Sequence, residues 1–149
     1  MSRLTSKAHE SCGVFVRNPD GRFLFYRRTL YPADGLTVPS GHVDTGERPQ
    51  EAAARELAEE VGKAARITAS QIVPIASDDI GGDSCRLGSG MHRWHTFLAI
   101  LSSPIEPEDV TVIEEGKKPV LLTLEEALAQ ELAYPVKYVI EQHAADLKR

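Results

Sequence analysis

Residues 49–61 have the sequence of an amphipathic helix with both ends marked. Pro49 suits the first turn, where its missing N–H costs little, and Gly62 is typical of the position just past a last turn. Three carboxylates fall within an arc of about 100° on the helical wheel, those of Glu56, Glu59 and Glu60. The opposite side carries Ala54, Leu57, Ala58 and Val61. We therefore expect a helix over Pro49–Val61 with one acidic side and one packed side.

The segments around this helix are mostly β-rich. We expect strands over residues 10–17, 22–28, 37–38, 66–77, 92–101, 110–113 and 119–122. The turn sequence Asn18-Pro-Asp-Gly21 joins the first two as a hairpin. Thr123 and Glu126 form a capping-box pattern at the start of one further helix, and a last helix begins near Tyr134. This order predicts an α/β/α sandwich or another layered α+β fold, in a single domain over residues 1–149.

The spacing of apolar residues identifies candidate core residues, and turn-rich or glycine-rich composition identifies two loops. The strand over 66–77 contributes Ile67, Ile72, Val73 and Ile75, and the last helix contributes Val136, Val139, Ile140 and Leu147. Residues 39–46 are predicted to form an irregular, turn-rich connection. Residues 78–91 are glycine-rich and are predicted to form a long mobile loop, which is either a lid over a substrate or a variable surface loop.

Composition narrows the class of protein. The formal charge of −5 on 149 residues argues against broad contact with nucleic acid, which needs a basic surface. No apolar run has the length of a membrane span or a signal peptide. The two cysteines, Cys12 and Cys85, lack zinc-site spacing and make a poor disulfide framework, so we expect reduced thiols and a cytoplasmic protein. The oligomeric state stays open.

The three clustered glutamates need a physical explanation. Two unit charges 4 Å apart repel by roughly 4 kcal/mol at an effective dielectric near 20. A divalent cation would neutralise them, and oxygen ligands favour magnesium or manganese. Magnesium shares its remaining positions with substrate phosphates, which indicates phosphate chemistry. A solvated glutamate face on a surface helix is the simpler explanation of the carboxylates taken alone.

The residues around the glutamates favour the metal. Gly41, Glu47, Arg55, Glu56, Leu57, Glu59, Glu60 and Gly62 have the identities and spacing of the Nudix box, and only Lys63 departs from it. The segment Gly41–Lys63 therefore resembles the Nudix hydrolase family. So many specified residues at fixed spacing make a specific signal. The resemblance implies an α+β fold, a Nudix-like α/β/α sandwich with a mixed β-sheet.

The resemblance also implies roles for individual residues. Glu56, Glu59 and Glu60 would ligate Mg²⁺, with Mn²⁺ as the other candidate, and the backbone of Gly41 would lie close to the metal. Arg55 would pair with Glu47 and hold the box loop against the helix, and Gly62 would be structural. Glu60 or Glu59 would accept the proton of the attacking water. Family members also take this base from a loop outside the box, where Glu114 and Glu115 are the candidates here.

Outside the box the signals are weaker. Trp94 either stacks on a nucleobase or belongs to the core. His42 lies inside the box loop and is a candidate substrate-binding residue. Arg27 and Arg28 end a strand that we expect to face the site, and Arg28 is a candidate phosphate ligand. Two arginines at a strand end are also common without such a role.

The implied activity is cleavage of a phosphoanhydride bond in a nucleoside diphosphate linked to another group. A nucleoside triphosphate and a nucleotide sugar such as ADP-ribose both fit this description. The alternative is a non-catalytic nucleotide-binding or regulatory module on the same fold. The complete set of carboxylates counts against that alternative. An isoprenoid diphosphate isomerase would call for a modified box, and this box has no such modification.

Overall fold

The computed structural model describes residues 9–28, 35–61, 72–81, 91–110 and 117–149. Among these residues, four strands precede the first helix, three more strands follow it, and two helices come last. The elements are β1 (His9–Arg17), β2 (Phe23–Arg28), β3 (Leu36–Thr37), β4 (Ser40–His42), α2 (Pro49–Glu60), β5 (Ile72–Gly81), β6 (Met91–Ile100), the 3-10 turn η3 (Pro107–Asp109), β7 (Lys117–Leu122), α3 (Leu124–Leu128) and α4 (Tyr134–Lys148).

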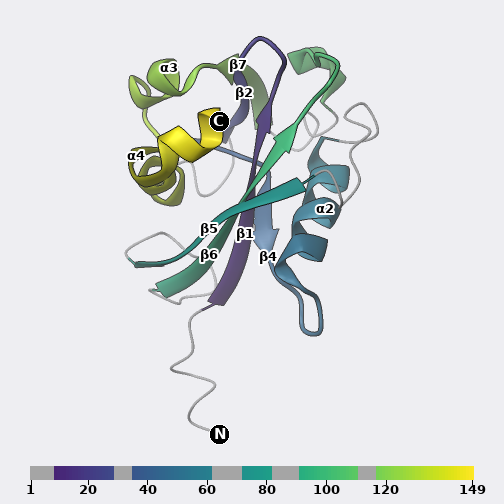
Figure 1. The fold of residues 1–149 in the computed structure, drawn as a ribbon, viewed down its shortest axis with the longest axis vertical. Coiled ribbons are helices and arrows are strands. Elements are labelled where there is room, and N and C mark those ends of the chain that lie inside the picture. The colour runs from purple at the N-terminus through teal and green to yellow at the C-terminus, as the bar shows by residue number, and fades with distance from the viewer. Residues whose placement is uncertain (1–8, 29–34, 62–71, 82–90, 111–116) are drawn as a thin grey trace, which may run out of the picture.

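The strands form one mixed sheet. Its main path is β3-β2-β1-β6-β5, with β4 paired to β1 and β7 paired to β2. The strands β1 and β6 run parallel, whereas β1–β2, β1–β4, β2–β3, β2–β7 and β5–β6 are antiparallel. Figure 1 shows α2 on one side of the sheet and α3 and α4 on the other. The predicted α+β fold with a mixed sheet is confirmed.

Each face of the sheet has its own hydrophobic core, and β1 shows why. Successive side chains of a strand point to opposite faces. Cys12, Val14 and Val16 pack with the apolar residues of α2. Phe15 packs with the apolar stripe of α4 on the opposite face. Below, these two faces are called the α2 face and the α4 face.

The helix α2 buries the side that its sequence predicts, with one exception. Leu57 and Val61 are buried, and Ala54 packs against the same core. Ala58, however, is exposed. The buried stripe is centred on Ala53 and Leu57, and this rotation of the helix leaves the next position in solvent. On the acidic side, Glu59 is likewise exposed.

The predicted connection over residues 39–46 contains a strand that the sequence did not indicate. In β4, Gly41 pairs with Cys12 of β1. The backbone N–H of Val14 donates to Pro39 O at 2.9 Å, and that of Val43 donates to Glu10 O at 2.8 Å. A strand of three residues is too short to show an alternating pattern, so only the pairing with β1 defines it.

The strand β5 also differs from expectation. It continues through Gly81, so residues 78–81 are strand rather than loop, and Met91 already belongs to β6. A bulge between Pro74 and Ala76 shifts the register. Val73, a predicted core residue, is 45% exposed, whereas Ile72 is buried as predicted. Residues 66–71 and 82–90, including Ile67 and most of the proposed lid, lie outside the described residues.

Other local predictions hold. At the hairpin, Gly21 N–H donates to Asn18 O at 2.9 Å and Gly21 has a φ of 90°. Thr123 and Glu126 form the predicted capping box. The strand predicted over residues 119–122 is β7, which begins two residues earlier. Val110 lies outside any strand, and the rest of the strand predicted over 110–113 is outside the described residues.

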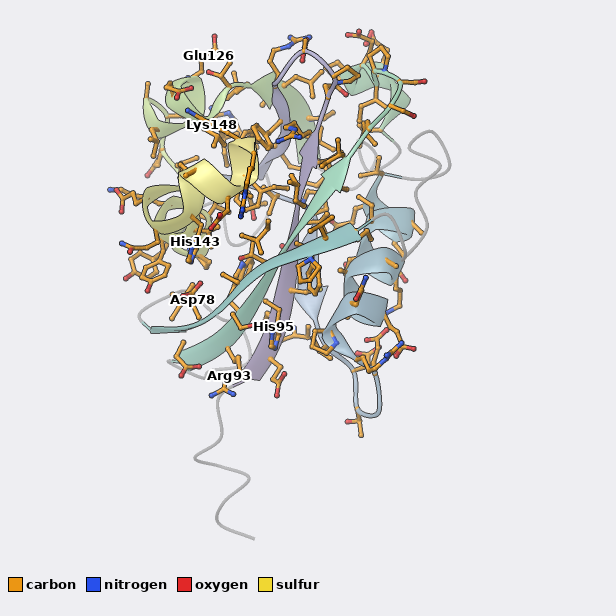
Figure 2. All side chains as sticks on the ribbon, in the orientation of Figure 1. Asp78, Arg93, His95, Glu126, His143 and Lys148 are labelled. Carbon is orange, nitrogen blue, oxygen red and sulfur yellow. The ribbon has the colours of Figure 1, made fainter. Side chains whose placement is uncertain are left out.

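The helix α4 covers the α4 face and is tied to β5. Its predicted apolar stripe, Val136, Val139, Ile140 and Leu147, is buried. Asp78 and His143 point toward one another in Figure 2, with His143 Nε2 3.0 Å from Asp78 Oδ2. The backbone of His143 departs from helical geometry, with φ −130° and ψ 20°. None of the helices in the described residues is both long enough and apolar enough to cross a membrane.

Candidate active site

Arg55 is the centre of a network that fixes the box loop to α2. Its guanidinium donates two hydrogen bonds to the Glu47 carboxylate, from Nε at 2.9 Å and from Nη2 at 3.0 Å. Nη2 also donates to the backbone carbonyl of His42 at 3.1 Å. The N–H of Asp44 donates to Glu47 at 3.0 Å. The structure thus contains the Arg55–Glu47 pair expected from the resemblance, in the bidentate geometry that guanidinium and carboxylate favour.

The same guanidinium contacts the acidic side of α2. Arg55 Nη1 lies 2.9 Å from Glu56 Oε2 and 3.5 Å from Glu59 Oε1. The Glu56 side chain is only 12% exposed, whereas that of Glu59 is 60% exposed. The glutamates therefore lie at different depths. Glu56 is at the base of the site and Glu59 is at its rim.

Gly41 fits against the Glu56 carboxylate. A Cβ atom added at Gly41 would lie 2.2 Å from Glu56 Oε2 and 2.3 Å from Glu56 Cδ. No ordinary Cβ atom tolerates such a contact with a carboxylate. The short strand β4 therefore brings backbone directly against the buried glutamate, and only glycine allows that approach.

The electrostatics of the site follow from this arrangement. Burial, then the neighbouring charge of Glu60, raises the pKa of Glu56 to about 7 even though Arg55 acts in the opposite direction. Hydrogen bonds from Arg55 and from the Asp44 N–H lower the pKa of Glu47 to about 2. Two carboxylates that contact the same guanidinium thus have pKa values shifted in opposite directions, downward for Glu47 and upward for Glu56.

These residues fit a hard divalent cation by the chemistry of their donors. Glu56 feels unfavourable charge from both Glu60 and Glu59, and a cation would relieve it. Within the described ranges no three His, Cys, Asp or Glu side chains stand together as a metal-binding group. In this conformation Arg55 supplies the positive charge at Glu56 and Glu59. A bound cation would compete with Arg55 for both carboxylates.

Cys12 lies beside this site and was not singled out from the sequence. It pairs with Gly41 in the sheet and is fully buried on the α2 face. Burial, then the charge of Glu56, raises the pKa of its thiol to about 12. The side chain is therefore a neutral apolar neighbour of the carboxylates. Its position depends on the pairing of β1 with β4, which the sequence did not indicate.

Two candidate substrate ligands face away from the carboxylates. In register, Ser11 pairs with His42 on one side and with Trp94 on the other, so these side chains share the α4 face. His42 contributes its backbone carbonyl to Arg55. Trp94 is 6% exposed and packs in the core over Gly13, where an added Cβ would meet its ring at 2.4 Å. The geometry favours the core interpretation of Trp94.

Of the two arginines at the end of β2, the structure describes the side chain of Arg27 alone, and its placement does not support a phosphate site. Arg27 donates to Gln130 Oε1 at 3.1 Å and pairs in register with Leu36 of the α4-face core. Its side chain is thus directed away from α2, contrary to expectation. The side chain of Arg28 lies outside the described part of the chain, as do Gly62, Glu114 and Glu115. Their proposed roles stay predictions.

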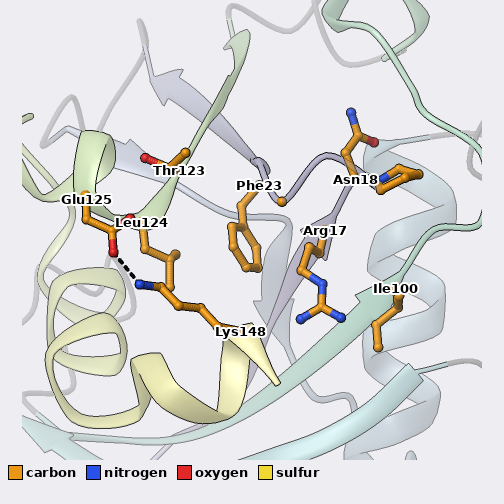
Figure 3. A pocket seen from close by; sticks show the side chains of 10 residues that line it. Arg17, Asn18, Phe23, Ile100, Thr123, Leu124, Glu125 and Lys148 are labelled. Atoms are coloured by element: carbon orange, nitrogen blue, oxygen red, sulfur yellow. Dashed lines mark hydrogen bonds and ion pairs between the residues drawn. The ribbon is translucent and has the colours of Figure 1, made fainter.

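A cavity of about 440 Å³ lies at a different part of the molecule, between the β1–β2 hairpin and the end of α4 (Figure 3). Its cationic side chains are engaged within the protein. Arg17 Nη1 donates to Leu147 O at 2.7 Å and to Arg149 O at 3.0 Å. Lys148 pairs with Glu125. These contacts hold the end of α4 against the hairpin and α3. The cavity does not belong to the carboxylate site.

Comparison with known proteins assigns this arrangement to a family. The NUDIX domain profile matches residues 7–143. An RNA pyrophosphohydrolase of Gluconobacter oxydans (strain 621H) is 41% identical over 69 residues, which are 46% of this chain and 41% of that protein. A second, from Halorhodospira halophila (strain DSM 244 / SL1), is 48% identical over 50 residues, 34% of this chain and 26% of that protein. The matches thus span less than half of these relatives.

Solved structures share the fold. The E. coli dihydroneopterin triphosphate pyrophosphohydrolase has a TM-score of 0.71 at 21% identity, and the match covers 91% of this chain and 97% of that one. A C. elegans Ap4A hydrolase binary complex has a TM-score of 0.67 at 24% identity, covering 94% and 98%. Since the NUDIX domain profile extends over most of the sequence, this chain belongs to the Nudix family.

Proposed function

We propose that this protein is a Mg²⁺-dependent pyrophosphohydrolase, with Mn²⁺ as a possible substitute. It would cleave a phosphoanhydride bond in a nucleoside diphosphate linked to another group, either a nucleoside triphosphate or a nucleotide sugar such as ADP-ribose. One observation carries the proposal. The largely buried carboxylate of Glu56 lies against the Gly41 backbone with the charges of Glu60 and Glu59 nearby, and a bound cation would relieve their mutual repulsion.

Each residue of the site has a defined task in this proposal. Glu56, Glu59 and Glu60 would hold the cation, which supplies charge neutralisation at the phosphates when it is bound. Glu47 keeps Arg55 in place through two hydrogen bonds, so the box loop and α2 keep their relative position. Glu60 or Glu59 would accept the proton of the attacking water. Glu114 and Glu115 remain alternative candidates for that base.

The names of the relatives support this reaction class and leave the substrate open. They include an RNA pyrophosphohydrolase, a dihydroneopterin triphosphate pyrophosphohydrolase and an Ap4A hydrolase. The substrates in these names carry phosphoanhydrides and differ in the attached group. The net charge of −5 favours a small nucleotide over a long RNA, because an acidic surface repels a phosphate backbone.

A substrate panel tests the proposal. It contains nucleoside triphosphates, ADP-ribose, a dinucleoside polyphosphate and a 5′-triphosphorylated RNA oligonucleotide, each assayed with Mg²⁺ and with chelator. We expect Mg²⁺-dependent release of phosphate or pyrophosphate, and Glu60→Gln should lower turnover by orders of magnitude while the circular dichroism spectrum stays unchanged. Glu51→Gln, in the first turn of the same helix, is the matched control. Nucleotide binding without any hydrolysis would favour the non-catalytic module instead.

A further inference from the structure

Three side chains from three strands form a hydrogen-bonded relay next to the carboxylate site. His95 Nδ1 lies 2.8 Å from Ser77 Oγ, and His95 Nε2 lies 2.9 Å from Glu10 Oε1. Both ring nitrogens are therefore engaged, and the imidazole is fixed from two sides. Its side chain is 13% exposed, whereas that of Glu10 is 44% exposed and Ser77 faces solvent. The relay has a buried centre and two accessible ends.

The sheet register places His95 in line with Gly41 of the carboxylate site. Cys12 pairs with Gly41 on one side and with His95 on the other, and His95 pairs with Ser77. Residues that pair in this way share a face, so all four lie on the α2 face. Two strand spacings separate His95 from Gly41, a distance of about 10 Å. Figure 2 shows His95 toward the end of the sheet where β1 begins, and Figure 1 shows the loop from β4 to α2 at the same end.

The chemistry of the relay favours a ligand that donates hydrogen bonds. An ionised carboxylate only accepts, so in the tautomer that satisfies both contacts Nε2 donates to Glu10 and Nδ1 accepts from the Ser77 hydroxyl. The exposed lone pairs of Glu10 and Ser77 are then acceptors. The next pair along the face, Arg93 and Asp79, is closed on itself with Arg93 Nε 3.0 Å from Asp79 Oδ1. Among the described side chains, this surface therefore offers no spare cation for a phosphate and suits a neutral group with hydroxyls.

We propose that Glu10, His95 and Ser77 form a subsite that binds the sugar hydroxyls of the substrate. The inference rests on the proposed function, since it places the sugar beyond the diphosphate held at Glu56. A subsite two strand spacings, about 10 Å, from Gly41 would suit a sugar that is joined through phosphates to the group held at Glu56. Carboxylates recognise ribose hydroxyls in other nucleotide-binding proteins. His95 acts as a positioning residue because it fixes both acceptors.

Matched substrates with and without hydroxyls test the subsite. The wild-type protein should hydrolyse ATP with a kcat/KM roughly ten-fold or more above that for 2′,3′-dideoxy-ATP, because the latter leaves two acceptors unpaired. Ser77→Ala and Glu10→Gln should bring this ratio toward one, mainly through KM for ATP. The control Asp79→Asn, one register position away on the same face, should leave the ratio unchanged. A wild-type ratio near one, or a ratio that the first two variants do not alter, overturns the proposal.

A binding measurement keeps the subsite testable even if the proposed activity fails. Imidazole resonances of the metal-free protein would be followed by NMR, with His95→Gln used to assign the His95 signals. Adenosine should shift these signals in a saturable manner, and 2′,3′-dideoxyadenosine should not. Equal shifts with both nucleosides, or none with adenosine, refute the subsite. Failure to hydrolyse any member of the substrate panel would refute the proposed function alone.

Discussion

Arg55 shows how one side chain can set the properties of several others. Its guanidinium lies within hydrogen-bonding distance of Glu47 and Glu56, and its own pKa is raised, first by Glu47. Because a guanidinium stays protonated at any ordinary pH, this charge is permanent. Glu47 receives two of its hydrogen bonds and stays ionised. Glu56 receives one and is buried, so burial dominates and its pKa rises to about 7.

The ionisation of Glu47 should make the free energy of unfolding depend on pH. Its pKa falls from 4.5 to about 2 in the folded protein, so the native state binds fewer protons than the unfolded state between these values. The contribution is therefore complete above pH 4.5 and is lost as the pH falls toward 2. Glu47→Gln should flatten the decline in unfolding free energy over this window, measured by urea denaturation. Glu108→Gln, at an exposed position, should keep the wild-type slope. An unchanged slope in Glu47→Gln would contradict the assignment.

Gly41→Ala should impair the site through a direct clash. The added Cβ would lie 2.2 Å from Glu56 Oε2, so the carboxylate or β4 must move. A displacement of about 1 Å at a reacting centre can cost on the order of a hundred-fold in rate, and we expect a loss of that size in kcat/KM. Gly21→Ala is the control. Its φ of 90° strains alanine through the backbone, yet nothing lies within 4 Å of its added Cβ. Equal activity losses in the two variants would exclude the steric explanation.

At the scale of elements, α2 begins without a side-chain cap. Arg48 occupies the N-cap position and makes no capping hydrogen bond with its side chain, although its own N–H donates to Glu51 Oε1 at 2.9 Å. Arg48→Ser should complete the capping box and stabilise the protein by about 1 kcal/mol. For a chain of this size that corresponds to roughly 2–4 °C in Tm, measurable by calorimetry. Arg48→Ala, which offers no acceptor, should show no gain. A gain as large in Arg48→Ala would mean that removal of the arginine alone is responsible.

The elements that the sequence predicted are those with local signals. The helix α2 has marked ends, the hairpin has its turn residues, and Thr123 with Glu126 forms a cap that depends on four consecutive residues. The strand β4 has no such signal, because its three residues are defined by pairing with β1. The bulge in β5 likewise depends on the register between strands that are distant in the sequence. The same holds for the row of paired residues Gly41, Cys12, His95 and Ser77. The box glutamates were therefore identifiable from sequence, whereas Cys12 and the relay around His95 were not.

For the molecule as a whole, the net charge of −5 favours a cation and opposes an anionic substrate. A cation at the carboxylates would reverse the local sign of the field, so substrate and metal should bind cooperatively. Glu56 must lose its proton before it can ligate, and its pKa near 7 makes this step depend on neutral pH. Metal affinity is thus expected to rise between pH 6 and pH 8.

Magnesium should therefore stabilise the folded protein more strongly at pH 8 than at pH 6. A ligand at a hundred times its dissociation constant that binds only the native state adds about 2.7 kcal/mol. The corresponding increase in Tm would be followed by differential scanning calorimetry at constant ionic strength, with KCl replacing MgCl₂ in the reference. Glu56→Gln should abolish the increase and its pH dependence, because an amide neither titrates nor neutralises the cation. Glu51→Gln, on the same helix and remote from the cluster, should retain both. An increase of equal size in KCl, or in Glu56→Gln, would show that magnesium acts on the general surface charge and not at the carboxylates of α2.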